Sequence, residues 1–186
     1  MLTEKIIENR KFLELLKKND QQATHYFISM FNEKLYKYFL ISGLSRDDCA
    51  ELTQQTFYNF FKKLRTTPFP YINNITSYLF KIAKNCMIDY VRRYQTQKKV
   101  LDEYTGKITN LEDGKYTDNI ALVLSVLTQL EPYERDIVIF HLVLGHTFKE
   151  ISKILNISTS RVKRLFYKTF EKLRTLFFNR LKVTNL

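Results

Sequence analysis

The chain has 186 residues, a formal net charge of +11 and a hydrophobic fraction of 45%, which argues against global disorder. Only 4 glycines and 3 prolines are present, too few for the many turns of a β-architecture, so an all-α fold is expected. No apolar run resembles a signal peptide or a membrane span, and we therefore expect a cytoplasmic protein. Cys49 and Cys86 are interpreted as buried free thiols rather than as a disulfide or a metal site.

The positive charge lies in two blocks. Residues 1–94 carry 15 basic and 9 acidic side chains, and residues 119–186 carry 11 and 5, whereas residues 95–118 carry 4 and 5. A basic balance favours polyanionic partners such as nucleic acids, because their binding releases counterions. Charge alone fits a solvated, soluble surface equally well.

The first half of the chain predicts a compact bundle of four helices. Apolar residues at helical spacing place these helices at about 5–18, 23–41, 46–64 and 75–94. Gly43 ends the second helix, and Ser45 followed by Asp47 and Asp48 is a suitable start for the third. The two prolines of "TTPFPYINN" separate the third helix from the fourth.

The stretch 95–118 has no sustained hydrophobic period and contains Gly106 and Gly114, which predicts a linker. Helical patterning resumes at Asn119 and includes a helix closed by Gly145. We therefore expect an N-terminal domain over residues 1–94, a linker over 95–118 and a C-terminal domain over 119–186.

The segment "EISKILNISTSRVKRLFY" predicts a helix-turn-helix. Ser152 is small where bulk would prevent close packing, Asn156 tolerates a left-handed corner, and Ser158 or Thr159 can cap the second helix. Arginine suits guanine, whereas lysine and hydroxyl groups suit phosphates and base edges. The alternative is a basic, solvated helical hairpin. The predicted outward-facing residues of the second helix are Thr159, Ser160, Arg161, Lys163, Arg164, Tyr167 and Lys168.

The fourth helix, which begins "SYLFKIAKNCMIDYVRR", and the loop before it combine aromatic, amide and cationic side chains. Rings stack on unpaired bases, Asn bonds base edges and cations hold phosphates, so this chemistry suits single-stranded DNA. From composition alone, a bundle helix with an exposed polar rim is the more economical interpretation. The candidate contacts are Phe69, Tyr71, Asn73, Asn74, Tyr78, Lys81, Lys84, Asn85, Asp89, Arg92 and Arg93.

Three segments together resemble bacterial RNA polymerase sigma factors in their order and spacing. They are "DDCAELTQQTF", "SYLFKIAKNCMIDYVRR" and "LEPYERDIVIFHLVLGHTFKEISKILNISTSRVKRLF". The similarity is to the small, two-domain extracytoplasmic-function (ECF) type, and it covers roughly residues 25–94 and 120–175. It implies a sigma region 2 bundle and a sigma region 4 helix-turn-helix domain. The implied function is that of an alternative sigma factor, which directs core polymerase to specific promoters and helps to open the DNA.

The resemblance also implies roles for individual residues. The fourth helix and its loop would face the melted minus-ten element, with a base captured by the loop, and the helix from Thr159 would face the minus-thirty-five element. Asp89 could instead be structural. Tyr78 replaces the family's usual Trp, Gln55 stands where an acid is common, and Arg161 stands where a Thr is usual. Binding of core polymerase falls to Asp48, Glu51, Gln54 and Gln55.

The implied partners are core RNA polymerase and promoter DNA, duplex upstream and single-stranded at the melted element. An anti-sigma factor is a further candidate partner, and no membrane insertion is expected. No phosphate loop, metal motif or nucleophile–base set is recognisable, so we expect no enzyme, no catalytic residues, no metal and no cofactor. A stand-alone helix-turn-helix regulator remains the alternative, although "DDCAELTQQTF" has no role in it. An RNA-binding helical protein is also compatible with the charge.

Overall fold

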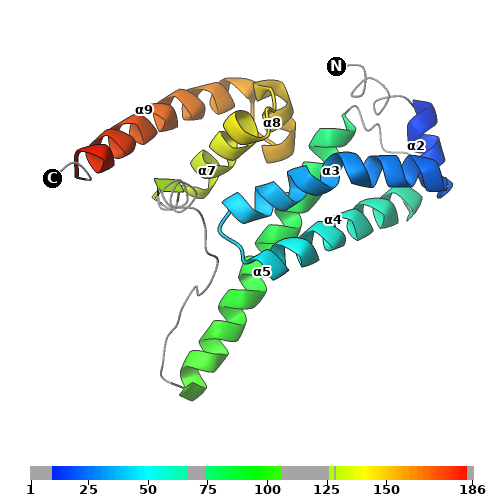
Figure 1. Cartoon of the computed structure of the whole chain (residues 1–186), viewed down its shortest axis with the longest axis horizontal. Coiled ribbons are helices and arrows are strands. Elements are labelled where there is room, and N and C mark those ends of the chain that lie inside the picture. The colour runs from blue at the N-terminus through cyan, green and yellow to red at the C-terminus, as the bar shows by residue number, and fades with distance from the viewer. Residues whose placement is uncertain (1–9, 67–73, 106–125, 128, 184–186) are drawn as a thin grey trace. The chain divides into compact units, whose positions relative to one another are not determined.

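The computed structural model describes residues 10–66, 74–105, 126–127 and 129–183, and every regular element in these ranges is helical. This confirms the expected all-α fold for the described residues. The chain divides into two compact units, the first made of residues 1–40 and 44–114 and the second mostly of residues 115–186 (Figure 1). None of the described helices combines the length and the apolar character needed to cross a bilayer.

The first unit contains four described helices whose ends follow from the local sequence. Gly43 has a φ of +93°, which ends α3, and the Asp48 amide donates to Ser45 Oγ at 3.2 Å, which caps α4. The amide of Ser77 donates to Asn74 Oδ1 at 2.7 Å, which caps α5. The helices are α2 (Arg10–Lys17), α3 (Gln21–Ile41), α4 (Arg46–Thr66) and α5 (Ile75–Thr105).

An aromatic core joins α3, α4 and α5. The ring of Phe27 on α3 stacks on Phe60 of α4, with centroids 4.7 Å apart and an interplanar angle of 20°. Tyr38 of α3 meets the edge of Phe80 on α5 at 6.0 Å. Offset and edge-to-face ring pairs of this kind add roughly 0.5–1.5 kcal/mol each beyond the burial of their area. The core therefore fixes which faces of α4 and α5 point to solvent.

Cys49 and Cys86 are both buried free cysteines, as predicted. Burial, together with the nearby negative charge of Asp48, raises the pKa of the Cys49 thiol to about 12. The thiolate is the reactive form of cysteine, so this group is inert at neutral pH.

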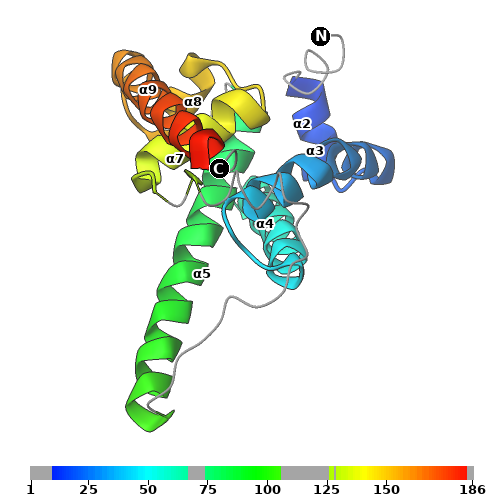
Figure 2. The same ribbon diagram turned by 60° about the vertical axis from the view of Figure 1, so that its left-hand side comes forward.

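Helix α5 is longer than its sequence pattern suggested. The expected end was residue 94, but the helix continues to Thr105 through the first part of the stretch predicted as a linker (Figure 2). Residues 95–105 contain no glycine or proline, and Gly106 is the first residue that favours a break. Hydrophobic period reports which face of a helix packs against a partner, and its loss does not exclude a helix.

The second unit is built from α7 (Pro132–Val138), η1 (Ile139–Val143), α8 (Phe148–Leu155) and α9 (Thr159–Val183). The single helix predicted before Gly145 ends in a π-helical turn, in which the Leu144 amide donates to the Ile139 carbonyl at 3.1 Å. Phe140, Ile151 and Val162 are buried between these elements.

A charged pair links α7 to α9 across this unit. Lys172 Nζ lies 2.8 Å from both carboxylate oxygens of Glu134, whose side chain is only 6% exposed. Burial raises the pKa of Glu134, but the hydrogen bonds from Lys172 and from the Glu131 backbone outweigh burial, so the pKa is lowered from 4.5. A lowered folded-state pKa means that the pair stabilises the unit above about pH 4.5, and that this contribution is lost as the pH falls through the folded-state value.

Replacing Glu134 by Gln is expected to lower the free energy of unfolding by about 1–2 kcal/mol at pH 7, because Lys172 then loses its charged partner. The loss is limited because the Lys172 ammonium group can still be solvated. Chemical denaturation followed by circular dichroism measures this change, and the difference from the wild type should shrink below pH 4.5. Glu171→Gln is the matched control, since its carboxylate is 70% exposed and its pair with Arg174 spans 3.8 Å. Equal destabilisation by the two variants would contradict a special role for Glu134.

Candidate functional surfaces

The second unit contains a complete helix-turn-helix corner. Helix α8 starts with a capping box, in which the Thr147 amide donates to Glu150 Oε2 at 2.8 Å and the Glu150 amide donates to Thr147 Oγ1 at 3.3 Å. The corner residue Asn156 is left-handed, with φ 55° and ψ 45°, as predicted. The Arg161 amide donates to Ser158 Oγ at 3.3 Å, so Ser158 is the residue that caps α9.

Helix α9 presents one apolar and one cationic face. Val162, Phe166 and Thr169 are buried against the rest of the unit. Thr159 is half-buried, and its hydroxyl donates to Ser152 Oγ at 3.2 Å, so its geometry suits holding the two helices together rather than reaching a groove. The other predicted contact residues are exposed as expected: Ser160, Arg161, Lys163, Arg164, Tyr167 and Lys168.

Helix α5 carries the predicted stripe of polar residues. Tyr78, Lys81, Asn85, Asp89 and Arg92 are spaced by three or four residues, which puts them on one face of the helix. Tyr78 is the most enclosed of them, and burial raises the pKa of its hydroxyl. Asp89 Oδ1 lies 3.9 Å from Arg92 Nη1 within the same helix, and both side chains are largely exposed. This ion pair is compatible with the alternative, structural role of Asp89.

The remaining residues predicted to contact the opened strand lie beside the stripe, at the start of α5 and in the loop before it. Lys84 and Arg93 flank the stripe, half-buried and exposed respectively. Asn74 is half-buried, and its side-chain oxygen Oδ1 caps α5. The other three predicted loop residues lie outside the described residues: Phe69, Tyr71 and Asn73.

Helix α4 exposes the residues predicted to bind polymerase, with one exception. Glu51, Gln54 and Gln55 are exposed. Asp48 is half-buried and accepts a hydrogen bond from the Ser45 hydroxyl at 2.5 Å. Burial first, then the interaction with Asp48, raises the pKa of the Tyr90 hydroxyl on α5. Asp48 therefore interacts within the unit, both at the start of α4 and with α5.

A second cross-helix link runs beneath Gln55. The Gln55 side-chain amide donates to Asn59 Oδ1 at 3.1 Å, and Asn59 Nδ2 donates to Cys86 Sγ of α5 at 3.3 Å. These bonds help to fix the exposed face of α4 relative to the polar stripe of α5.

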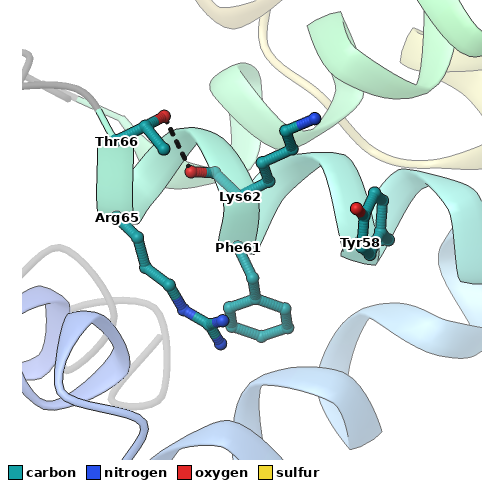
Figure 3. Close-up of a pocket in the computed structure, with 5 residues that line it drawn as sticks. All are labelled: Tyr58, Phe61, Lys62, Arg65 and Thr66. Carbon is teal, nitrogen blue, oxygen red and sulfur yellow. Dashed lines mark hydrogen bonds between the residues drawn. The ribbon is translucent and has the colours of Figure 1, made fainter.

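The same exposed face of α4 continues into a pocket that the sequence interpretation missed. The pocket has a volume of about 400 Å³ (Figure 3). Its residues are Tyr58, Phe61, Lys62, Arg65 and Thr66. Tyr58 follows Glu51 by seven residues and Lys62 follows it by eleven, so helical spacing alone could have extended the face to them.

Comparisons with known proteins agree with this geometry. A family model described as sigma-70, region 4, matches residues 120–173, which include the whole helix-turn-helix. The ECF RNA polymerase sigma factor SigM of Bacillus subtilis (strain 168) is 22% identical over 151 residues, covering 80% of this chain and 91% of SigM. Residues 120–173 are thus a sigma-70 region 4 domain, and over most of its length the chain is similar to a sigma factor of the ECF type.

Solved structures show that the chain shares a known fold. CnrH, solved in complex with the cytosolic domain of CnrY, superimposes with a TM-score of 0.70 at 19% identity, covering 92% of this chain and 98% of that chain. The sigma factor RpoE from Bartonella quintana, solved in complex with the anti-sigma factor NepR, gives a TM-score of 0.59 at 18% identity over 81% of this chain and 96% of that chain.

Within the described residues of the chain, no group of three or more His, Cys, Asp or Glu side chains is placed to hold a metal ion.

Proposed function

We propose that this chain is an alternative sigma factor, which directs core RNA polymerase to specific promoters and divides promoter recognition between three helices. Helix α4 binds core RNA polymerase, α9 holds duplex DNA at the upstream element, and α5 with the loop before it stabilises the opened strand. The division follows the predicted domains, with residues 1–94 for polymerase and the opened strand, residues 119–186 for the duplex, and 95–118 between them. The observation that carries the proposal is the intact helix-turn-helix whose exposed face is cationic.

The chemistry of each face supports its assignment. Carboxylate and amide groups on α4 of an otherwise basic protein complement a cationic protein surface better than a nucleic acid. On α9, arginine and lysine side chains flank an exposed tyrosine, which is the composition of a helix in a major groove. On α5, Tyr78 and Asn85 lie among cations, which suits unpaired bases.

The energetic role of the sigma factor is to lower the free-energy cost of opening the duplex. Unstacking and unpairing a base costs a few kcal/mol, and capture of the strand by α5 and its loop offsets this cost. Phosphate contacts from both units supply affinity, and the polymerase performs the bond-forming chemistry. We place this activity in the cytoplasm, together with bacterial transcription. An anti-sigma factor that binds this chain, as NepR binds RpoE of Bartonella quintana, would regulate it.

The direct test is reconstituted transcription. Purified chain is mixed with core polymerase of the source organism and a promoter library, and transcript 5′ ends are mapped against core polymerase alone. We expect a stable complex and a set of new start sites that share an upstream and a minus-ten element. Absence of both the complex and the new start sites would refute the proposal and favour a stand-alone regulator.

A further inference from the structure

The exposed face of α4 changes its chemical character along the helix. Asp47 and Glu51 lie in the first half, Tyr58 lies in the middle, and Lys62 and Arg65 lie in the second half. Their spacings of four, seven, four and three residues put all five on one face. A partner that lies along this face therefore meets negative charge at one end and positive charge at the other.

The positive end of the face is hollow rather than flat. Figure 3 shows the Phe61 and Arg65 side chains extending from the same side of α4, with the guanidinium beside the ring. Lys62 Nζ lies 6.0 Å from the centre of the Tyr58 ring. The pocket measures about 400 Å³, and none of its five lining residues is acidic. Arg65 Nη2 also donates a hydrogen bond to Asn19 Oδ1, which holds the guanidinium at the pocket. Two cations beside aromatic rings form a site for an anionic group carried on an apolar stem.

We infer that this pocket receives an acidic side chain, aspartate or glutamate, from the polymerase surface that lies along α4. The inference rests on the proposed function, because it takes the partner of Glu51 as given and extends the same contact. The polymerase segment then presents cations to the start of α4 and a carboxylate to its end. Such a charge order fixes the direction in which the two surfaces meet, since the reversed direction would juxtapose like charges.

Single-stranded nucleic acid is the competing occupant, because rings and cations also suit unpaired bases. The placement of the pocket argues against it. Phe60, two residues from Tyr58 and on the opposite side of α4, meets the edge of Tyr78 at 6.1 Å. The pocket thus lies on the side of α4 away from the polar stripe of α5, so a strand that follows the stripe does not run across it.

The test uses the full chain and core polymerase, with affinity measured by fluorescence anisotropy of labelled sigma factor. Lys62→Glu is expected to weaken binding about tenfold, and Lys62→Gln about threefold, because the first change repels the carboxylate and the second only removes its partner. Lys63→Glu is the matched control: it changes the same charge at the adjacent exposed position, off the face that carries the pocket. We expect a change of less than about twofold from it.

The outcomes separate the inference from the proposed function. Equal affinity of Lys62→Glu and Lys63→Glu for core polymerase overturns the inference about the pocket. It leaves the proposed polymerase contact of α4 intact, because that contact is tested separately by Glu51→Lys. Loss of binding to a labelled single-stranded oligonucleotide in Lys62→Glu, with core affinity unchanged, overturns it in favour of nucleic acid. Because Lys62 and Lys63 are both exposed, Lys62→Glu, Lys62→Gln and Lys63→Glu should all keep the wild-type melting temperature, which circular dichroism checks.

Discussion

Reversing the charge of Glu51 to lysine is expected to weaken binding of core polymerase about 100-fold, or roughly 3 kcal/mol, because it removes one charged contact and creates a repulsive one. Glu51 is exposed on α4, in the half of that face where carboxylates predominate. The Glu51 side chain makes no hydrogen bond to another described residue, so the substitution removes none. Binding of duplex promoter DNA by the isolated sigma factor is expected to stay unchanged, since that contact belongs to α9.

The control for Glu51→Lys is Glu33→Lys, which makes the same charge change on α3. Glu33 is exposed and pairs with Lys37 one turn away, a surface contact that contributes at most about 1 kcal/mol to stability. Binding of each variant to core polymerase and to duplex DNA is measured side by side. If Glu51→Lys lost both activities to the same extent, or if Glu33→Lys weakened polymerase binding equally, α4 would not be the polymerase contact.

The features that could be predicted from the sequence are those that depend on neighbouring residues. Asn156 at the corner, Ser158 as the cap of α9 and Ser45 as the cap of α4 each act within three residues of their own position. Hydrophobic period likewise predicted which side of α9 is buried. These features need only short-range geometry, which the order of residue types determines directly.

Contacts between distant residues could not be predicted in the same way. Asp48 was predicted to contact polymerase, but its interaction with Tyr90 could not be predicted, because Tyr90 lies 42 positions later and comes near it only where α4 and α5 pack together. Glu134 and Lys172 are separated by 38 positions and meet for the same reason. The pocket was missed for a different reason. Tyr58, Lys62 and Arg65 were assigned no role, although their spacing continues the face of Glu51.

Replacing Arg164 by alanine is expected to weaken binding to the preferred upstream element roughly 10- to 100-fold, because a bidentate contact between arginine and guanine contributes about 1–3 kcal/mol of discrimination. Arg164 is exposed on the cationic face of α9, in the turn that follows the cap at Ser158. The first turns of a recognition helix are those that approach base edges. Binding of core polymerase is expected to be unaffected.

Arg174→Ala separates base recognition from general attraction to DNA. It removes the same charge from the same helix, but it lies ten residues further on and its guanidinium pairs with Glu171 on the surface. Gel-shift titrations of both variants against the wild-type element and single-base substitutions of it measure the difference. If Arg164 contacts a base, the Arg164→Ala variant should bind elements with any of the four bases at that position with equal affinity. Loss of a phosphate contact would instead lower the affinity for every sequence and reduce its salt dependence. Uniform loss in both variants would assign Arg164 to the phosphates and leave Arg161 as the arginine to test next, because it precedes Arg164 by one turn on the same exposed helix.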